Sequence, residues 1–407
     1  MNHRSAIVIA IDGLRASALG AYGNAWQPTP ALDSLASQSL TVDWMWCDSP
    51  GLDGFYRAVW QGTPAKSSAN TVTAADEVAS TLPRRLAAVG VYAALTTDDP
   101  WVAAEADARQ FAEVRHIEAP ATEPAATVAD TALAQLVAIA VDQLVAWATP
   151  GSTSSAAAAA RLLWVHARGF HGPWDAPLAL RQQVLDEEDP PPAEFVEPPA
   201  CLAVDDHDAL LLVRAAYAAQ AAVLDECIDA LVAALSELGL DQETLVVLVG
   251  TRGFALGEHG HVGGECRSLY SELLHVPCLV RQPEGAAPPP RSSRLAQPGD
   301  LHSLLCEWFG LHEGGVVAEP RHWMLSNDDG ATTEPQAVRA SGDRGEQALR
   351  THAWMLRRQR GVAGSPDQVE LYAKPDDRWE ANEVADRCAD VVDELLAELG
   401  PAGRSSC

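Results

Sequence analysis

The chain of 407 residues contains 56 Asp and Glu against 28 Lys and Arg, which gives a formal net charge of −28. This charge repels phosphates, so we expect neither nucleic acid nor an anionic membrane surface as a partner. Hydrophobic residues make up 47% of the chain, which is ample for a sizeable core. No apolar run approaches the roughly 20 residues that a membrane-spanning helix needs. The length allows two or three domains, or one large α/β unit with an appendage.

The N-terminus and the cysteines bear on the compartment. Residues 1–4 lead into only six apolar residues, 6–11, so we expect no signal peptide. The eight cysteines are scattered and form no C-x-x-C pair, so we expect neither a metal cluster nor a disulfide framework. The sequence therefore predicts a cytoplasmic protein with reduced thiols.

Several apolar runs predict buried parallel strands, because they are continuous rather than alternating. They cover residues 6–11, 91–95, 162–165, 245–249 and 276–280. Helical patterns lie between them: one begins at Thr29-Pro30, one spans 82–89 before Gly90, and one spans 224–239. This alternation predicts an α/β fold with a doubly wound, mostly parallel sheet and helices on both faces.

Loop-like segments divide the chain. Residues 151–155 are small and polar, and residues 186–199 and 284–293 are rich in proline. Residues 327–345 are also loop-like and separate the last part of the chain. We therefore expect an α/β core over 1–326, a linker over 327–345 and a small C-terminal α+β subdomain over 346–407. In this subdomain, 353–356 and 369–372 are predicted antiparallel strands, and 384–399 is a predicted closing helix.

The residues that follow the predicted strands suggest a binding site. In open α/β sheets, ligands bind beyond the carboxyl ends of the strands. Asp12 and Arg15 follow the first strand, Arg168 and His171 follow a middle one, and Arg252 follows the strand at 245–249. A carboxylate, a histidine and arginines at one edge suit an anionic ester. The alternative is that Asp12 caps a helix and that the histidine is an ordinary loop residue.

At this point a family resemblance becomes specific. Residues 6–36, "AIVIAIDGLRASALGAYGNAWQPTPALDSLA", resemble the opening of the sulfatase family within the alkaline phosphatase superfamily. The resemblance continues through residues 49–62, which are similar to the family's nucleophile segment, and through "FHGPWDAP", which is similar to its substrate loop. It also includes "GEHG" at 257–260 and "ELY" at 370–372. It spans nearly the whole chain and implies the sulfatase fold.

The resemblance also implies a divalent cation, usually calcium, held by two acidic residues after the first strand and an Asp-His or Asp-Asn pair after the late strand. In this chain Asp12 matches the first position, Gly13 stands at the second, and Thr251 and Arg252 stand at the late pair. Calcium needs six to eight oxygen ligands. We therefore expect no bound cofactor, with Asp12 as the sole metal ligand; calcium is the cofactor if the family site functions. A different metal site at Glu258 and His259 is a further alternative.

The family's nucleophile is a Cys or Ser that is converted to formylglycine. Counting back from Arg57 places Asp53 at this position, whereas counting forward from Ser49 places Leu52 there. Neither residue can become formylglycine, and the register stays open.

The resemblance leaves Asp53, Arg57 and His171 as catalytic remnants. It also leaves a candidate anion-binding set, which consists of Arg15, Arg57, Arg168 and His171.

Arg252 suggests why the metal would be missing. A guanidinium is always protonated and would repel a dication nearby, so we hypothesise that Arg252 is a surrogate cation that pairs with Asp12. The sequence thus favours a sulfatase-like pseudoenzyme that binds a sulfated or phosphorylated small molecule or a protein partner. One alternative is an active sulfate- or phosphate-ester hydrolase with a rearranged site, in which Asp53 serves as nucleophile or base. Another is a purely structural protein.

Overall fold

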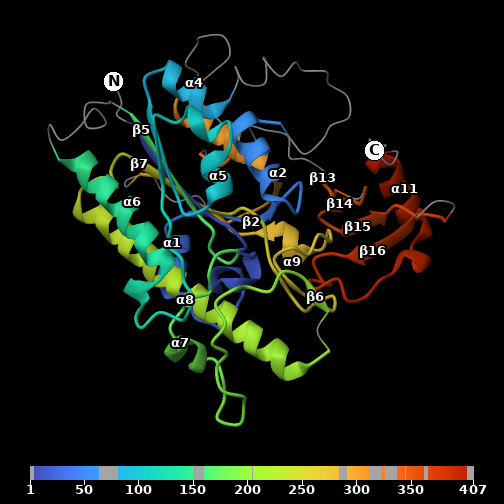
Figure 1. Ribbon diagram of the computed structural model, residues 1–407. Coiled ribbons are helices and arrows are strands. Elements are labelled where there is room, and N and C mark those ends of the chain that lie inside the picture. The colour runs from blue at the N-terminus through green and yellow to red at the C-terminus, as the bar shows by residue number, and fades with distance from the viewer. Residues whose placement is uncertain are drawn as a thin grey trace.

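A nine-stranded central sheet forms the core of the computed structural model, which describes residues 4–63, 81–149, 160–203, 205–283, 291–311, 322–325, 337–343, 345–361 and 365–400 (Figure 1). Its strands are β1 (Ser5–Ile11), β2 (Leu40–Trp46), β3 (Tyr92–Thr97), β4 (Glu113–His116), β5 (Arg161–Ala167), β7 (Thr244–Gly250), β10 (His275–Val276), β11 (Cys278–Arg281) and β12 (Ser292–Ala296). They lie in the order β10-β2-β11-β7-β1-β5-β3-β4, and β12 pairs with β2. The strands from β7 to β4 are parallel, which confirms the predicted α/β fold.

Helices cover both faces of this sheet (Figure 1). They are α1 (Pro30–Ser37), α2 (Leu52–Tyr56), α4 (Leu82–Ala88), α5 (Pro100–Ala104), α6 (Ala132–Ala148), α7 (Leu178–Gln182), α8 (His207–Glu237), α9 (Ser271–Leu274) and α10 (Pro298–Trp308). Ile7, Ile9 and Ile11 of β1 pack into one apolar cluster with α1, α6 and α8. The even-numbered residues of β1 pack into the other cluster, with α2, α4 and α10. Because both faces are buried, β1 is apolar throughout, which is why the sequence predicted it well.

The late apolar run at 276–280 differs from the prediction. It is divided at Pro277 into β10 and β11, because proline has no N–H to donate to a sheet. β11 is antiparallel to both β7 and β2, so the predicted parallel strand is wrong in direction. The sheet is therefore mixed on this side.

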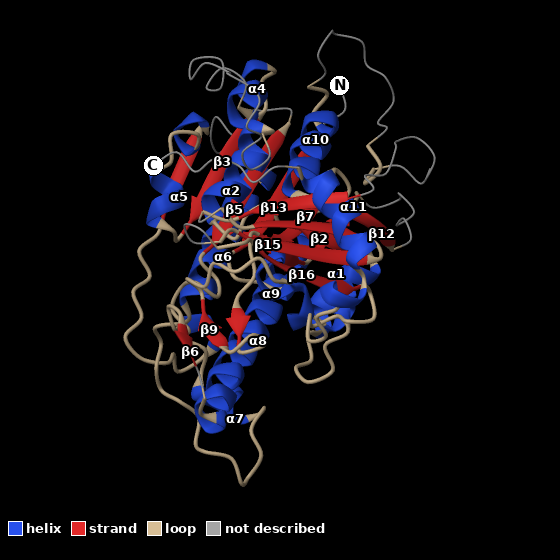
Figure 2. Cartoon of the chain, turned by 90° about the vertical axis from the view of Figure 1, so that its right-hand side faces the viewer, coloured by secondary structure: helices blue, strands red, loops and turns tan. Residues whose placement is uncertain are grey.

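The C-terminal part forms a separate antiparallel sheet, as predicted. Its strands are β13 (Ala337–Ser341), β14 (Gln347–Thr351), β15 (Trp354–Gln359) and β16 (Gln368–Ala373), and α11 (Ala389–Leu399) packs on it (Figure 2). β13 lies inside the stretch that was predicted to be loop-like, so the prediction of a loop is wrong over 337–341, and the domain boundaries stay a prediction. Residues 327–336 of the expected linker lie outside the described part.

A third, small sheet contains β6 (Leu202–Ala203), β8 (Ala255–Leu256) and β9 (His261–Gly263). The predicted loop at 186–199 is confirmed, whereas the loop at 151–155 falls outside the described residues. Of the loop at 284–293, residues 284–290 also fall outside them, and β12 begins at Ser292. Within the described residues, no helix combines the length and apolar character required to cross a bilayer.

Candidate functional site

The carboxyl ends of the parallel strands meet at the predicted edge. Ile11 is in register with Ala167 of β5 and with Gly250 of β7, so the residues after these three strands are neighbours. The amide of Asp12 donates to the Ala167 carbonyl at 2.9 Å, and the amide of Thr251 donates to the Ile11 carbonyl at 3.0 Å. Parallel pairing thus brings together side chains that are far apart in the sequence.

Asp12 is the centre of this site and is fully buried. Arg252 reaches it with both nitrogens of one guanidinium edge, since Nε donates to Oδ1 and Nη2 donates to Oδ2, each at 2.8 Å. The Thr251 hydroxyl also donates to Oδ1 at 2.8 Å. This is the bidentate arginine–carboxylate geometry that combines strength with a fixed orientation.

The charges at the site set the pKa of Asp12. Burial alone would raise this pKa, but the Arg252 guanidinium and, to a lesser degree, His171 outweigh burial and hold it well below its usual range. Asp12 is therefore a carboxylate at any ordinary pH. Burial lowers the pKa of Arg252, but the charge of Asp12 and their hydrogen bond raise it above its usual value. The pair is a fixed ion pair.

His171 completes the cluster in a neutral form. Its Nδ1 lies 3.2 Å from Nη2 of Arg252, and because guanidinium nitrogens only donate, Nδ1 must accept. The proton is therefore on Nε2, which lies 4.0 Å from Oδ1 of Asp12. Burial lowers the pKa of His171 to about 4, with Asp12 opposing this shift and Arg252 adding to it.

The residues around Asp12 do not fit a calcium ion. Gly13 has φ of +76°, and a Cβ there would lie 2.7 Å from Cβ of Phe170 and 2.8 Å from Cδ2 of His171. A carboxylate side chain at this position would therefore require the loop to move. Arg252 already binds both oxygens of Asp12, and among the described residues Asp12 belongs to no group of three or more candidate metal ligands, whereas calcium prefers six to eight oxygens.

The predicted nucleophile segment forms α2 and continues into a π-helical turn, Arg57–Gln61. Leu52 points into the core, whereas the Asp53 side chain is 63% exposed and pairs with Arg57 at 2.9 Å. A pocket of about 340 Å³ lies beside them, and Trp101 also lines it. Asp53 is thus the one of the two candidates that faces a pocket.

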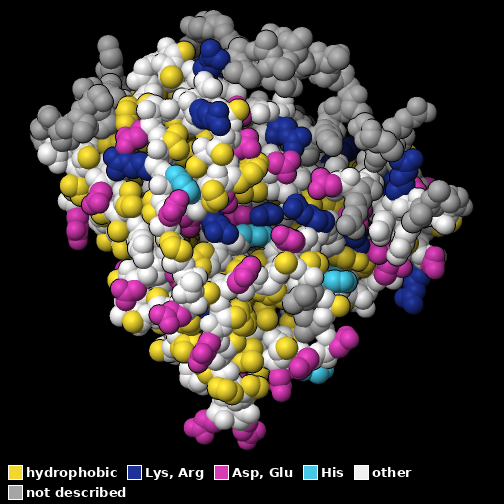
Figure 3. Space-filling view, in the orientation of Figure 1, with side chains coloured by type: hydrophobic (Ala, Val, Ile, Leu, Met, Phe, Trp, Pro, Cys, Tyr) yellow, Lys and Arg dark blue, Asp and Glu magenta, His cyan; other side chains and the backbone are white. Residues whose placement is uncertain are grey.

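The predicted anion-binding residues do not share one pocket. Arg15 pairs with Glu258 at 2.5 Å and lines a different pocket, of about 320 Å³. Arg168 donates from Nη2 to the His171 carbonyl at 3.2 Å. On the face shown in Figure 3, Lys and Arg side chains form a short row with a histidine below α2 and α5, and acidic side chains border the row. The basic groups on this face therefore have carboxylates next to them.

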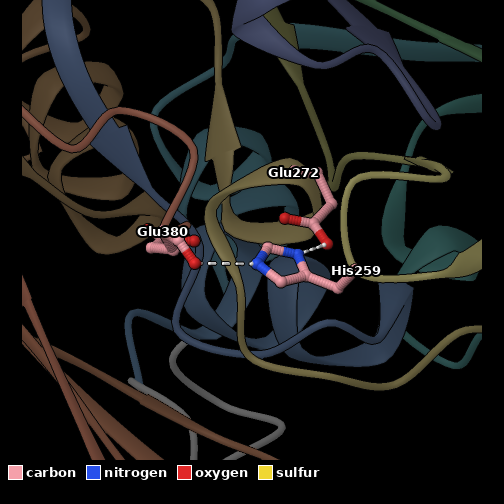
Figure 4. Close-up of side chains that lie close together, drawn as sticks. All are labelled: His259, Glu272 and Glu380. Carbon is pink, nitrogen blue, oxygen red and sulfur yellow. Dashed lines mark hydrogen bonds and ion pairs between the residues drawn. The ribbon is translucent and has the colours of Figure 1, made fainter. Parts of the chain in front are cut away.

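A second cluster contains His259, Glu272 and Glu380, whose ligand atoms lie within 4.8 Å of one another (Figure 4). Nδ1 of His259 lies 2.7 Å from Oε1 of Glu272, and Nε2 lies 3.3 Å from the Glu380 carbonyl. Burial lowers the pKa of His259, but the hydrogen bond and charge of Glu272 raise it above its usual value. The hydrogen bond to Glu272 therefore favours the protonated form of this imidazole, in which no lone pair is available to a metal.

Glu380 in this cluster already has cationic and neutral donors. Its Oε1 lies 2.7 Å from Nζ of Lys374, and its Oε2 accepts from the Ser271 amide at 2.9 Å. The cluster is therefore an ion-pair network that joins the C-terminal subdomain to α9. Of the two residues predicted for an alternative metal site, His259 belongs to this cluster, whereas Glu258 pairs with Arg15 instead.

Two contacts made by cysteines were not predicted from the sequence. The Cys47 thiol donates to the Thr251 carbonyl at 3.3 Å, directly behind the Asp12 site, and burial raises its pKa well above the usual value. Cys201 and Cys266 form a disulfide that closes a 65-residue separation, so the expectation of reduced thiols is wrong for these two residues. No spacing rule would have paired them, because β6 and β9 bring them together only in the fold.

Comparisons with known proteins agree with this architecture. The protein BT4656, solved in complex with its substrate D-glucosamine-2-N,6-O-disulfate, superposes with a TM-score of 0.72 at 14% identity over 97% of this chain and 96% of that chain. The phosphonate monoester hydrolase of Agrobacterium radiobacter gives 0.70 at 16% identity over 97% and 95%. BT1596, a 2-O GAG sulfatase, gives 0.70 at 16% identity over 97% and 91%. At these identities the likeness shows the fold alone.

Sequence comparison identifies the family. No curated protein sequence matches the chain. The family model described as Sulfatase matches residues 4–311, which contain the strand ends, Asp12 and Arg252. The chain therefore belongs to the sulfatase family, in the alkaline phosphatase superfamily.

Proposed function

We propose that this protein is a non-catalytic member of the sulfatase family, in which Arg252 takes the place of the divalent cation. The observation that carries the proposal is the bidentate pair of Arg252 and Asp12, with both distances at 2.8 Å. A dication beside this guanidinium would be repelled, and the guanidinium cannot lose its proton to relieve the repulsion. Metal and nucleophile act as a unit in this chemistry, so loss of the metal removes most of the rate enhancement.

The groups near the site also support an inactive protein. Asp53 is exposed and paired with Arg57, so its surroundings do not fix its carboxylate in a position to attack a substrate. Thr251 directs its hydroxyl at Asp12, which is a carboxylate already neutralised by Arg252. The Cys47 thiol is buried and its pKa is raised, which disfavours the thiolate that acts as a nucleophile.

For the ligand we propose a small anionic molecule that is bound and not hydrolysed. The support is the chemistry named for two structural relatives, a disulfated sugar for one and phosphonate monoesters for the other. The pocket beside α2 is poorly suited to hold it, because one arginine lines that pocket with four carboxylates: Asp53, Glu105, Asp107 and Asp343. The anion is therefore expected to bind in a different cavity.

Turnover assays test the proposed function. We expect no hydrolysis of aryl sulfates, aryl phosphates or aryl phosphonate monoesters above the background rate, with calcium, manganese or zinc added or with a chelator. The Asp53→Asn variant is the matched control. Hydrolysis that is present in the native protein and lost in Asp53→Asn would overturn the proposal in favour of a rearranged active hydrolase that uses Asp53.

A further inference from the structure

A cavity of about 330 Å³ lies where the C-terminal subdomain meets the core. Trp44 of β2 and His275 of β10 line its core side, while Arg350 of β14 and the turn residues Lys374 and Arg378 line its other side. It shares no lining residue with the pocket beside Asp53, and neither Asp12 nor Arg252 lines it. It is therefore a separate site from the Asp12 cluster.

The charge of this cavity is opposite to that of the chain as a whole. Four cationic residues line it against one carboxylate, Asp43: they are Arg291, Arg350, Lys374 and Arg378. Arg291 pairs with Asp43, and Lys374 pairs with Glu380 at 2.7 Å. Among the residues that the structure describes, no carboxylate lies within ion-pair distance of Arg350 or Arg378. Two guanidinium groups therefore have no carboxylate in direct contact, and only the more distant charge of Glu380 acts on Arg350, in a protein with twice as many acidic as basic residues.

Two donor nitrogens of Arg350 have no hydrogen-bond acceptor among the described residues. Arg350 is 1% exposed, and its guanidinium lies over Trp44, 4.9 Å from the centroid of the indole ring. Nη1 donates to the Thr351 carbonyl, whereas Nε and Nη2 are buried and have no acceptor among the described residues. These two nitrogens share one edge of the guanidinium, the fork that binds an oxyanion through two parallel hydrogen bonds. In Arg252 the same edge holds the carboxylate of Asp12.

The positive charges that line the cavity also act on the imidazole of His275. Burial lowers the pKa of His275 to about 3, and the charges of Arg350, Arg378 and Lys374 add to this shift. The ring is therefore neutral at ordinary pH, and its Nε2 donates to the Asp43 carbonyl at 2.7 Å, which holds the ring in one orientation. Burial also lowers the pKa of Arg350, to about 10, which leaves it protonated at neutral pH. The field of the cavity is therefore constant over the physiological range.

We propose that this cavity binds a small organic anion, a phosphate or sulfate monoester, whose oxyanion occupies the Nε–Nη2 edge of Arg350 and whose ring packs against the aromatic wall formed by Trp44 and Trp46. Buried donors without acceptors and buried unpaired charges are unfavourable, and an oxyanion satisfies both at once. The volume is at the small end of known ligand sites, which suits a single ring and not a polymer. The proposal does not depend on the loss of catalysis, because the cavity is separate from the Asp12 site.

Binding of defined probes to the full chain tests the proposal. Calorimetry and thermal unfolding are measured with inorganic phosphate, inorganic sulfate, phenyl phosphate and phenyl sulfate, each against chloride at matched ionic strength. We expect the phenyl esters to bind more tightly than the inorganic ions, and the phosphate and sulfate arms to identify the ester. Arg350→Met should weaken binding by at least about tenfold, since it removes two charge-assisted hydrogen bonds.

The stability of Arg350→Met and one further variant, Arg378→Gln, serve as controls. Arg350→Met should fold at least as stably as the native protein without ligand, because it removes an unpaired buried charge. Arg378→Gln, on the exposed rim, should weaken binding by about threefold or more without affecting the fold. If Arg350→Met does not fold, Arg378→Gln decides the question.

The results distinguish binding in this cavity from binding in the pocket beside Asp53 and Arg57. The proposal is overturned if no probe binds better than chloride, or if binding is lost in Arg57→Gln and retained in Arg350→Met and Arg378→Gln. Turnover of an ester would overturn the proposed lack of catalysis without affecting this site.

Discussion

The guanidinium of Arg252 meets both oxygens of a fully buried carboxylate, and this makes the two residues depend on each other. Breaking a buried ion pair from one side leaves an uncompensated charge, which typically destabilises a protein by about 3–5 kcal/mol. Exposed pairs behave differently, because water solvates whichever partner remains. Loss of Arg252 should therefore destabilise the protein more than loss of an exposed arginine.

Arg252→Met should lower the free energy of unfolding by about 3–5 kcal/mol, measured by urea denaturation at neutral pH. The matched control is Arg57→Gln, which breaks the exposed pair with Asp53 and should change stability by less than about 1 kcal/mol. The double variant Asp12→Asn with Arg252→Met should recover part of the loss. Equal stability of Arg252→Met and the native protein would show that the ion pair is not needed to compensate Asp12.

His171 gives a prediction for pH. Its folded-state pKa is about 4, below the ordinary value of 6.5, so between these pH values the unfolded chain binds a proton that the folded chain does not. Above about pH 6.5, His171 therefore has no effect on the pH dependence of the free energy of unfolding. As the pH falls towards 4, this free energy declines by about 3 kcal/mol in total. In His171→Gln this part of the slope should be missing, as seen by comparing urea unfolding at several pH values. Parallel pH profiles for the two proteins would contradict the assignment of a buried neutral imidazole.

At the scale of elements, apolar continuity was enough to predict β1, β3, β5 and β7, because each is buried on both faces. β2 was not predicted, since Thr41 and Asp43 interrupt its apolar run and its partners β10, β11 and β12 come from much later in the chain. β11 was predicted as parallel because periodicity carries no information on direction.

The same distinction holds for the site. The meeting of Asp12 with Thr251 and Arg252 could be predicted, since parallel strands bring their carboxyl ends to one edge. The pair of Arg15 and Glu258 and the contact of Cys47 with Thr251 could not, because they depend on how loops pack.

The disulfide gives a prediction for the small sheet. Cys201 and Cys266 close a 65-residue separation, and a loop of this length corresponds to about 4 kcal/mol of stabilisation in the chain-entropy model. Peptide mapping without reductant should recover the two cysteines as one linked fragment. Replacement of both by alanine should lower the free energy of unfolding by about 2–4 kcal/mol. An equally stable double variant would show that the disulfide does not stabilise the fold.

For the molecule as a whole, the net charge of −28 means that the folded chain repels itself. Added sodium chloride should therefore raise the midpoint of thermal unfolding between about 0.01 and 0.3 M, as the Debye length shortens. The matched control is an equal osmolality of a neutral sugar, so that the effect of charge screening can be separated from solvent exclusion. A midpoint that falls with chloride would show that attractive surface pairs outweigh the repulsion.

The cytoplasmic location stays a prediction. The Cys201–Cys266 disulfide weighs against it, since disulfides persist mainly in oxidising compartments. The acidic character of the chain is compatible with either compartment.

The central claim is that a fixed protein charge has replaced the metal of this sulfatase-family site. It is tested most directly by measuring calcium in the purified native protein by elemental analysis, together with calcium titration by calorimetry. Our account predicts no stoichiometric calcium, no binding heat and no calcium-dependent shift of the thermal midpoint, because Arg252 already neutralises Asp12. Binding of one calcium ion per chain that is lost in Asp12→Asn would contradict it.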